Sequence, residues 1–338
     1  MGGGSLRRYL LARLALTVPM LLILLTLVFL LLRVAPGDPV TATLGTRLTQ
    51  EQIEERREAL GFNDPLIVQY GRYMAGALTG DFGDPITDRR SVGEIIADAA
   101  PATFELAVAA MLVALVLGVG VGAVSGRLRD SPFDVGGRLF GIVAYAAPIF
   151  WTGLLAQLFF GVYLGWLPTS GRASGFDVPT DVTGFYVLDS IITLDLPALV
   201  STLEHLVLPG ITLGLLIGGV FIRLVRVNML QTLRSDYVEA ARARGVGERR
   251  VLFGHAFRNA LVPIVTIVGL QAALLMGGAI LTETTFGFPG LGTAIVDFLG
   301  ARDYVAVQGI TTFIALVVVV VSLVIDVING LVDPRVRY

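Results

Sequence analysis

The sequence predicts an all-α, polytopic membrane protein with six transmembrane helices and with both termini in the cytoplasm. Its composition is the first reason: 54% of the 338 residues are hydrophobic and 15% are charged, a balance unlike that of a soluble domain. The second reason is the length of its apolar stretches, six of which reach the roughly 20 residues that a helix needs to cross a bilayer. The third is the placement of its arginines, which gather in short loops on one side of those stretches.

The six apolar stretches lie, in chain order, at Leu10–Leu32, Phe104–Ser125, Leu139–Leu164, Leu206–Val227, Leu261–Leu281 and Val307–Leu331. The first is longer than the apolar core of a signal peptide, and Ala35–Pro39 after it is typical of a turn, not of a cleavage site. Pro148 lies inside the third stretch and predicts a kink there. Small residues that permit close helix packing, which is favoured over a pore-lining role, are Gly118, Gly120, Gly122, Gly214, Gly218 and Gly219.

Arginine placement predicts the orientation, because short arginine-rich loops stay on the cytoplasmic side. From Arg223 to Arg258 there are eight arginines against three acids, whereas the segment from Gly165 to Glu204 has one arginine against five acids. Further arginines on the predicted cytoplasmic side are Arg7, Arg8, Arg13, Arg127, Arg129, Arg138, Arg335 and Arg337. The loop from 35 to 98 has six arginines, but loops beyond about 60 residues contribute little to orientation.

Three parts of the chain follow from this topology. Residues 1–34 form the cytoplasmic N-terminus and the first transmembrane helix, and residues 35–98 form an extracytoplasmic loop or cap. Within that cap, Thr49 is positioned to cap a helix that runs to Leu60. Residues 99–338 form the transmembrane core, with a cytoplasmic loop at about 228–260.

Missing residue types exclude several kinds of chemistry. All 25 basic residues are arginine, so the chain has no lysine for a phosphate-binding P-loop or a Schiff base. There is no cysteine and there are only two histidines, His205 and His255, on predicted opposite sides of the membrane. We therefore expect no catalytic residue, no cofactor and no metal site, and an energy source outside this chain if it is a pump.

The middles of the predicted spans are nearly free of charge, with no charged residue in 113–122, 153–161, 213–221 or 267–275. An ion-coupled carrier usually places ionisable side chains deep in its spans, and a serine hydrolase needs a nucleophile with a base beside it. Asp326 lies near the cytoplasmic end of the sixth span, where a role in packing or interfacial hydration is favoured over a role in transport.

The basic loop before the fifth span predicts a short helix. Asp236 is positioned to cap it, with Glu239 reaching back as in a capping box, and Gly245 fits the left-handed residue that ends a helix. Helical spacing places Val238, Ala241 and Gly245 on one face. A second helical run is expected from Glu248 to Ala260, leading to Pro263. Two interpretations stay open on these grounds: a docking element for a soluble partner, or a solvated helix that only sets topology.

The segment Glu239-Ala240-Ala241-x-x-x-Gly245 resembles the EAA loop of membrane subunits in ABC importers. The surrounding sequence from Asp236 to Pro263 is similar to the dipeptide/oligopeptide/nickel permease family, and specifically to the first permease of the pair, which carries a large loop after its first span. Motifs typical of that family occur in order at Ala35–Pro39, Leu60–Phe62, Gly80–Gly83, Pro101–Thr103, Phe150–Leu154, Gly165–Gly171, Phe286–Gly292 and Asp333–Tyr338. The resemblance covers nearly the whole chain.

This resemblance implies a permease subunit of an ATP-driven importer in the cell membrane, which forms the translocation path for peptides or similar small solutes and is not itself an enzyme. The implied partners are a second homologous permease subunit, two cytoplasmic ABC ATPases, an extracytoplasmic solute-binding protein and the lipid bilayer, with no nucleic acid. The implied ATPase-coupling residues are Glu239, Ala240, Ala241 and Gly245, with Arg242 and Arg244 and then Arg249 and Arg250 at the rim.

Alternatives remain at this point. The solute could be a dipeptide, an oligopeptide, nickel or an oligosaccharide, because the binding protein largely sets the choice in such systems. The chain could also be a membrane scaffold or receptor that docks a cytoplasmic partner, or an ion-coupled secondary carrier. Whether its partner permease is a paralogue or a second copy does not follow from the sequence.

Overall fold

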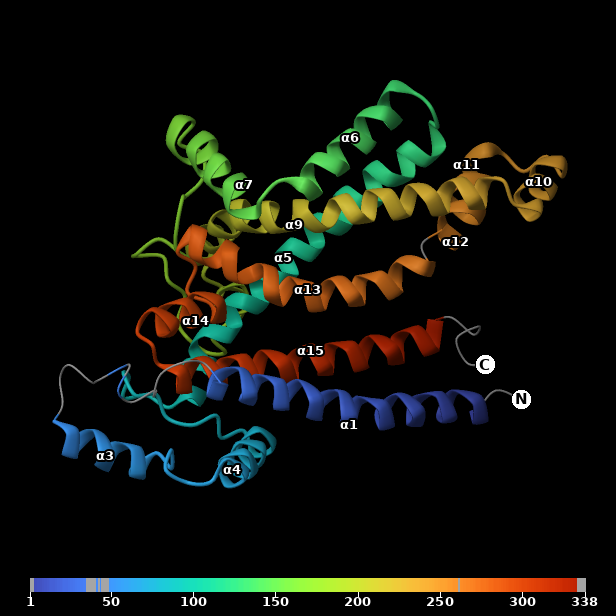
Figure 1. The fold of residues 1–338 in the computed structure, drawn as a ribbon. Coiled ribbons are helices and arrows are strands. Elements are labelled where there is room, and N and C mark those ends of the chain that lie inside the picture. Colours follow the sequence, from blue (N-terminus) through green and yellow to red (C-terminus); the bar gives the residue numbers. More distant parts are fainter. Residues whose placement is uncertain (1–2, 35–40, 42, 44–48, 261, 333–338) are drawn as a thin grey trace.

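The computed structural model describes residues 3–34, 41, 43, 49–260 and 262–332, and all regular secondary structure in these ranges is helical (Figure 1). Four described helices are long and apolar enough to cross a membrane. They are α1 (Gly3–Val34), α5 (Val92–Arg127), α9 (Leu196–Leu233) and α15 (Tyr304–Val332). The predicted all-α, polytopic membrane fold is confirmed.

Two further apolar segments are bent, and each is long enough to cross a membrane only if its two halves are counted as one span. The first joins α6 (Pro132–Ala146) to α7 (Ile149–Ala156) and its π-helical continuation η1 (Gln157–Tyr163), with a 106° angle between the two halves. Ala147 at the break is extended, as expected for a residue that precedes a proline, so the kink predicted at Pro148 is confirmed. The second bent span is α13 (Val262–Phe286), with a 47° change of direction. Counting each bent pair as one span gives six.

Shorter helices cover both ends of the spans. They are α3 (Gln50–Ala59), α4 (Leu66–Thr79), α8 (Tyr186–Ile192), α10 (Asp236–Ala243), α11 (Glu248–Arg250), the π-helical η2 (Val251–Phe257), α12 (Arg258–Ala260) and α14 (Leu291–Gly300). The helical run predicted from Glu248 to Ala260 is thus confirmed, with a π-helical middle. At Thr49, the predicted cap is confirmed: its hydroxyl accepts from Gln52 N, and the Gln52 side chain accepts from Thr49 N.

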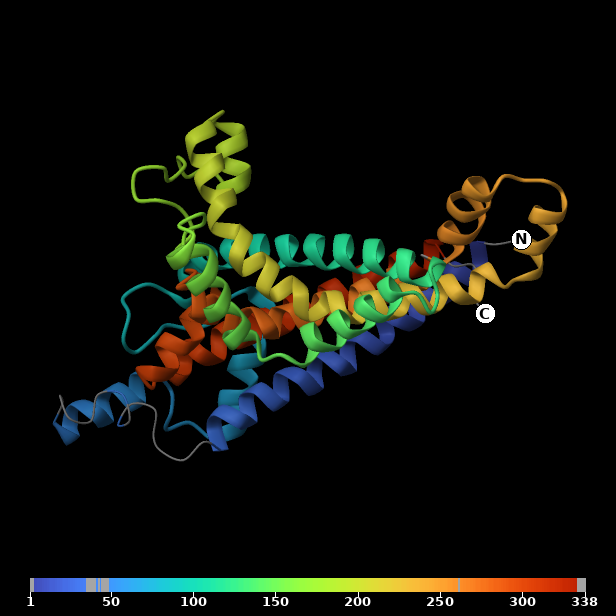
Figure 2. The ribbon, with the colours of Figure 1, turned by 90° about the horizontal axis from the view of Figure 1, so that it is seen from above.

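The spans run between two ends that differ in what they carry. The start of α1, the end of α15 and α10 to α12 lie together at one end, here called the α10 end, while α3, α4 and α14 lie at the other, the α3 end (Figure 1). From above, α10 to α12 project from the bundle opposite α3 (Figure 2). That the α10 end is cytoplasmic remains a prediction from the arginines. The predicted turn Ala35–Pro39 and the tail arginines Arg335 and Arg337 lie outside the described residues.

The core is organised around α5 and α9, which pack more extensively than any other pair of described helices. Glycines make this close approach possible: a Cβ on Gly118 would lie 2.2 Å from Phe221 Cβ, one on Gly122 2.7 Å from Val225 Cβ, and one on Gly214 2.7 Å from Ala110 O. The packing role predicted for these glycines is confirmed. A Cβ on Gly120, which belongs to the same helix as Gly118, would meet no atom within 4 Å, so Gly120 takes no part in this contact.

A second packing unit joins the first and last spans. The α1 and α15 helices lie side by side (Figure 1), and Arg13 Nη2 lies 3.4 Å from Asp326 Oδ1. Asp326 is therefore a packing residue at a helix interface, as expected from its place near the end of its span.

Replacing Gly118 with valine should destabilise the bundle, because the added atoms overlap Phe221 on α9. Overpacking of this kind typically costs about 1–3 kcal/mol. The thermal unfolding midpoint of the purified chain in detergent measures the effect. Gly120→Val is the matched control on the same helix, and its midpoint should stay at the wild-type value. Equal losses in both variants would mean that α5 and α9 are not in the described register.

Candidate functional site

In the loop that follows α9, the N-cap residue of α10 lies one position earlier than the sequence predicts. Ser235 and not Asp236 is the N-cap residue: its backbone is extended, and its carbonyl accepts from Val238 N at 2.9 Å and Glu239 N at 3.2 Å. The predicted capping box of Asp236 and Glu239 is therefore wrong. Both acids lie instead in the first turn of α10, where their charge stabilises the positive end of the helix dipole.

The predicted end of α10 is confirmed. Gly245 has φ +78°, in the left-handed region that residues other than glycine rarely adopt. The chain turns there, with Gly245 N donating to Arg242 O at 2.9 Å and Val246 N donating to Ala241 O at 3.2 Å. A Cβ at Gly245 would meet no atom within 4 Å, so backbone conformation alone requires glycine at this position.

One face of α10 is buried in its own chain and the other is exposed. Val238 and Ala241 are fully or almost fully buried, in the same core as Val251 and Ala256 of η2. Glu239 and Ala240 are exposed. The shared face predicted for Val238 and Ala241 is therefore confirmed, but Gly245, predicted on the same face, is exposed and lies beyond the end of α10 at Ala243. Glu239 and Ala240 are the two residues of the EAA segment that the helix presents outward.

Arg242 fixes the turn that follows α10. Its guanidinium binds the Glu248 carboxylate twice, with Nη2–Oε1 at 2.8 Å and Nε–Oε2 at 3.2 Å, and it also reaches Leu233 O at 3.4 Å. These hydrogen bonds lower the pKa of Glu248 and raise that of Arg242. Arg244 Nε donates to Ala240 O at 3.2 Å. Both arginines are exposed, but Arg242 is engaged within the loop.

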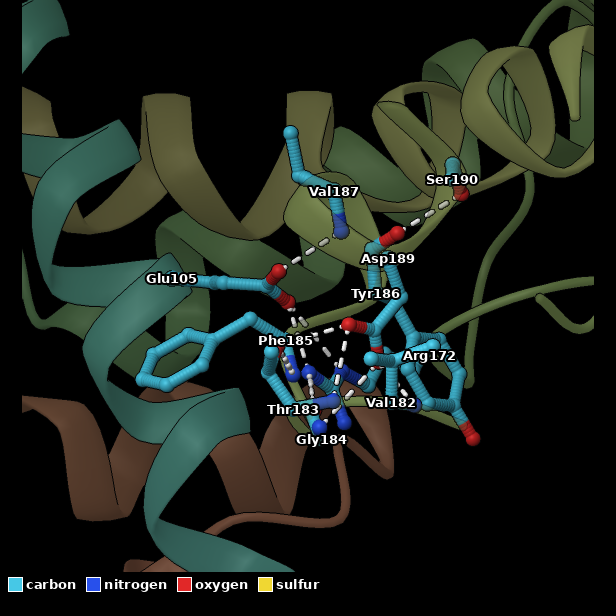
Figure 3. Close-up of polar contacts among 10 residues, drawn as sticks. All are labelled: Glu105, Arg172, Val182, Thr183, Gly184, Phe185, Tyr186, Val187, Asp189 and Ser190. Atoms are coloured by element: carbon cyan, nitrogen blue, oxygen red, sulfur yellow. Dashed lines mark hydrogen bonds and ion pairs between the residues drawn. The ribbon is translucent and has the colours of Figure 1, made fainter. Parts of the chain in front are cut away.

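At the α3 end, a buried ion pair joins the loop before α8 to α5 (Figure 3). Arg172 Nη2 lies 2.7 Å from Glu105 Oε2, and both side chains are less than a tenth exposed. The guanidinium also donates to Gly184 O at 2.7 Å and stacks 3.7 Å from the ring centre of Tyr186. The other Glu105 oxygen accepts from Val187 N at 2.7 Å, so one carboxylate of a spanning helix holds both the loop and the first turn of α8.

Asp189 holds the same loop from within (Figure 3). Its carboxylate is buried and accepts from Val182 N, Thr183 N, Thr183 Oγ1 and Gly184 N at 2.6–3.2 Å. Burial raises the pKa of Asp189, but the hydrogen bonds from Thr183, Val182 and Gly184 outweigh it and keep the pKa below its ordinary value. The stabilisation is thus present above the ordinary carboxyl pKa and is lost as the pH falls through the lowered value.

Two more buried carboxylates anchor neighbouring elements of this end. Glu283, near the end of α13, accepts from Thr103 Oγ1 of α5 at 2.7 Å and from Gly292 N of α14 at 2.7 Å. Asp303 accepts from Ile86 N at 2.6 Å and Thr87 N at 2.7 Å, which fixes the loop before α5 to the start of α15. Sequence reasoning missed all four carboxylates as anchors. A carboxylate within or beside an apolar run was the available signal, because such a group requires donors.

Gly290 and Gly292 are required by the close approach of Glu283 and of the end of α13. A Cβ on Gly290 would lie 2.4 Å from its carboxylate carbon, and one on Gly292 would lie 2.5 Å from Ile280 Cα. Only glycine lets the start of α14 approach the carboxylate closely enough for its backbone N–H groups to donate.

The comparisons with known proteins agree with this architecture. Residues 114–338 match the sequence model of the family described as binding-protein-dependent transport system inner membrane component. The chain belongs to this family. Residues 6–107 match the N-terminal membrane component model of the same transport systems. The chain is therefore a multi-pass membrane subunit of a binding-protein-dependent transport system.

Several relatives cover nearly the full length of this family member. The chain is 38% identical to the dipeptide transport system permease protein DppB of Alkalihalophilus pseudofirmus, over 98% of this chain and 99% of the relative. It is 39% identical to the di/tripeptide transport system permease protein DppB of Pseudomonas aeruginosa, over 96% and 97%. Identity to the dipeptide transport system permease protein DppB of Escherichia coli is 36%, over 98% and 99%.

The Arg172–Glu105 pair generates a stability prediction. Arg172→Met should lower the free energy of unfolding by about 3 kcal/mol or more, because it leaves the buried Glu105 charge without its partner. The double variant Glu105→Gln/Arg172→Met should lose less than Arg172→Met alone. Thermal unfolding in detergent measures both, with Arg89→Met, an exposed arginine at the same end, as control. A double variant that loses as much stability as Arg172→Met alone, or more, would contradict coupling between the two charges.

Proposed function

We propose that this chain is the permease subunit of an ATP-driven importer of small peptides. In this proposal it forms the translocation path with a second homologous permease and couples to two cytoplasmic ABC ATPases through α10. An extracytoplasmic binding protein would deliver the solute at the α3 end. The observation that carries the proposal is the exposed Glu239–Ala240 face of α10, a helix that follows the longest described helix after a two-residue connection.

The construction of the α10 loop supports a role in coupling. Val238 and Ala241 are packed in the core that includes α9, so a displacement of α10 is resisted by buried apolar contacts and passes to the spans. The Arg242–Glu248 pair and the turn at Gly245 stiffen the exit from the helix. A loop that only set membrane topology would need none of these contacts, since charge alone suffices.

Glu239 is the residue best placed to meet a partner. Its side chain is exposed and makes no hydrogen bond or ion pair within the described part of the chain, and its electrostatic influence there is on Arg242. Its carboxylate is therefore available to a basic residue in a groove of the ATPase, and the small side chain of Ala240 beside it permits close approach. Gly245 acts by backbone conformation and Ala241 by internal packing. Arg244, Arg249 and Arg250 are exposed and fit a role at the rim.

The three parts of the chain take separate roles in this proposal. Residues 1–34 contribute the first span, residues 35–98 with α3 and α4 form a cap toward the binding protein, and residues 99–338 form the permease core with the coupling loop at 228–260. Helix α5 begins at Val92, so the cap leads directly into a span. The chain lacks lysine and with it the P-loop of an ATPase, which is why hydrolysis is assigned to partner subunits.

Peptides are the proposed solute because three near full-length relatives are named as dipeptide or di/tripeptide transport permeases. Nickel and oligosaccharides are the alternatives that an uptake assay must include. A complex purified through the tagged chain should contain two ATPases and a second permease, and its bound solute-binding protein can be screened against all three solute classes.

Glu239→Ala should reduce ATP-dependent uptake of a labelled dipeptide by about tenfold or more in proteoliposomes of the assembled complex, because a charge-assisted contact is lost. Gly245→Val should act in the same direction, since a β-branched residue is strained at positive φ. Both variants should reach the membrane at wild-type levels. The control is Asp297→Ala, which removes an exposed acid from α14, outside both the proposed cap and the coupling loop, and should leave uptake unchanged.

Normal uptake by both α10 variants would contradict the coupling role. Uptake that resists vanadate but stops when the ion gradient is collapsed would identify a secondary carrier. A complex that retains its cytoplasmic partner without any transport would identify a scaffold or receptor.

A further inference from the structure

An apolar groove lies between α6 and α9, separate from the α10 loop and the α3 end. It has a volume of about 550 Å³. Its floor is backbone, because Gly141 and Gly219 approach so closely that a Cβ on Gly219 would lie 2.4 Å from Gly141 O. Ile142 and Tyr145 of α6 line one wall, and both are more than 60% exposed. The groove is thus a shallow channel between α9, which is long enough to span a membrane, and α6, the first half of a bent pair.

Arginines line the same groove on both helices. Arg138 of α6 and Arg223 and Arg226 of α9 are part of its lining. A second cleft adjoins it and shares Arg138 and Arg226, and this cleft adds Arg129 and Arg234. All five arginines lie near the turn between α5 and α6 or near the end of α9, which places them at the α10 end of the bundle (Figure 1).

These arginines are only partly neutralised. Arg226 is paired with buried Asp134, with Nη2–Oδ2 at 2.7 Å, and Arg138 lies 3.8 Å from the same carboxylate. Arg129 pairs with Asp130 at 3.0 Å. The side chains of Arg223 and Arg234 make no ion pair or hydrogen bond among the described residues. Five arginines face two carboxylates, which leaves a net charge of about three positive at this position.

We propose that the groove binds an anionic phospholipid, with an acyl chain along Gly141 and Gly219 and the phosphate against Arg138 and Arg223. An amphiphile fits because the apolar and cationic parts are continuous: a free anion would occupy only the cationic part and leave the apolar wall uncovered. Arginine binds phosphate through two parallel N–H donors, and basic pockets between spanning helices on the cytoplasmic side suit anionic headgroups. The charge complementarity of the cluster selects this occupant over a zwitterionic lipid.

A lipid in this groove would also restrain the helix that leads into α10. Arg223 and Arg234 lie on α9 and at its C-terminal cap, and α10 follows the last residue of α9 after two residues. A lipid held between α6 and α9 therefore restrains the helix that carries the coupling loop. This restraint is a property of the chain itself and does not depend on the proposed solute or on the ATPases.

The test is lipid titration of the full-length chain, purified with its partners and delipidated, followed by native mass spectrometry. Wild type should prefer phosphatidylglycerol to phosphatidylcholine. Arg138→Gln/Arg223→Gln should reduce that preference by about 30-fold, because each arginine near an anionic lipid contributes about fivefold. Arg226 is left unchanged, since its loss would strand Asp134. The control Arg249→Gln/Arg250→Gln removes two exposed arginines from the same end but from outside the groove, and should keep the preference.

Equal losses in the two double variants would overturn the proposal, because they would reflect the general positive charge of this end and not a site. An unchanged preference in Arg138→Gln/Arg223→Gln would overturn it as well. If that variant does not fold, Arg223→Gln alone tests the proposal, with an expected loss of lipid preference of about fivefold. Arg223 is exposed and pairs with no acid among the described residues, so its replacement leaves no buried charge unpaired.

The alternative occupant of the groove is a protein partner. Because the chain has no cysteine, one introduced cysteine can be labelled selectively and distinguishes a bound lipid from a bound protein. Ile142→Cys should react with a lipid-soluble maleimide in the assembled complex, and added phosphatidylglycerol should slow the reaction. Complete protection in the complex together with free reaction in the isolated chain would show that a second permease occupies the groove and would overturn the lipid proposal.

Discussion

Buried carboxylates that accept backbone N–H groups hold the α3 end together. Glu105, Asp189, Glu283 and Asp303 each accept two or more hydrogen bonds, mainly from loop or helix-start backbone. An ionised carboxylate without donors would be very costly at such depth, so the surrounding backbone is constrained to supply them. Loops between the spans thereby become fixed parts of the fold, because each is tied to a spanning helix or to α8 by charge-assisted hydrogen bonds.

Glycine serves the same architecture in two different ways. Between α5 and α9 its missing side chain brings two helix backbones into contact, and beside Glu283 it brings N–H donors to a carboxylate. At Gly245 the requirement is conformational, since the position is open in space but has positive φ. A glycine in the sequence can therefore reflect either close packing or positive φ, and only the contacts around it in the structure show which of the two requires it.

The local features of the chain were predictable and the long-range ones were not. Hydropathy located the six spans, Pro148 located the bend, and Thr49 and Gly245 located helix ends, because each of these depends on residues close in sequence. The N-cap of α10 was misassigned because Ser235 and Asp236 are both suitable cap residues and only backbone geometry separates them. The buried carboxylates were missed as anchors because their partners are distant in sequence. Glu105 and Arg172 lie 67 residues apart, and a separation of that length does not show from the sequence that two residues meet. The exposure of Glu239 and the burial of Ala241 matched helical periodicity.

The close seam between α5 and α9 has a mechanical consequence. With backbones in contact at three glycines, the two helices have little room to slide past each other, and they behave as one beam. Helix α5 has 36 residues, so this beam is about 54 Å long. Pivoting by about 5° near one end would displace the other end by about 5 Å, roughly the rise of one helical turn. A small rotation of this rigid helix pair at one membrane surface would therefore displace its other end by several ångströms.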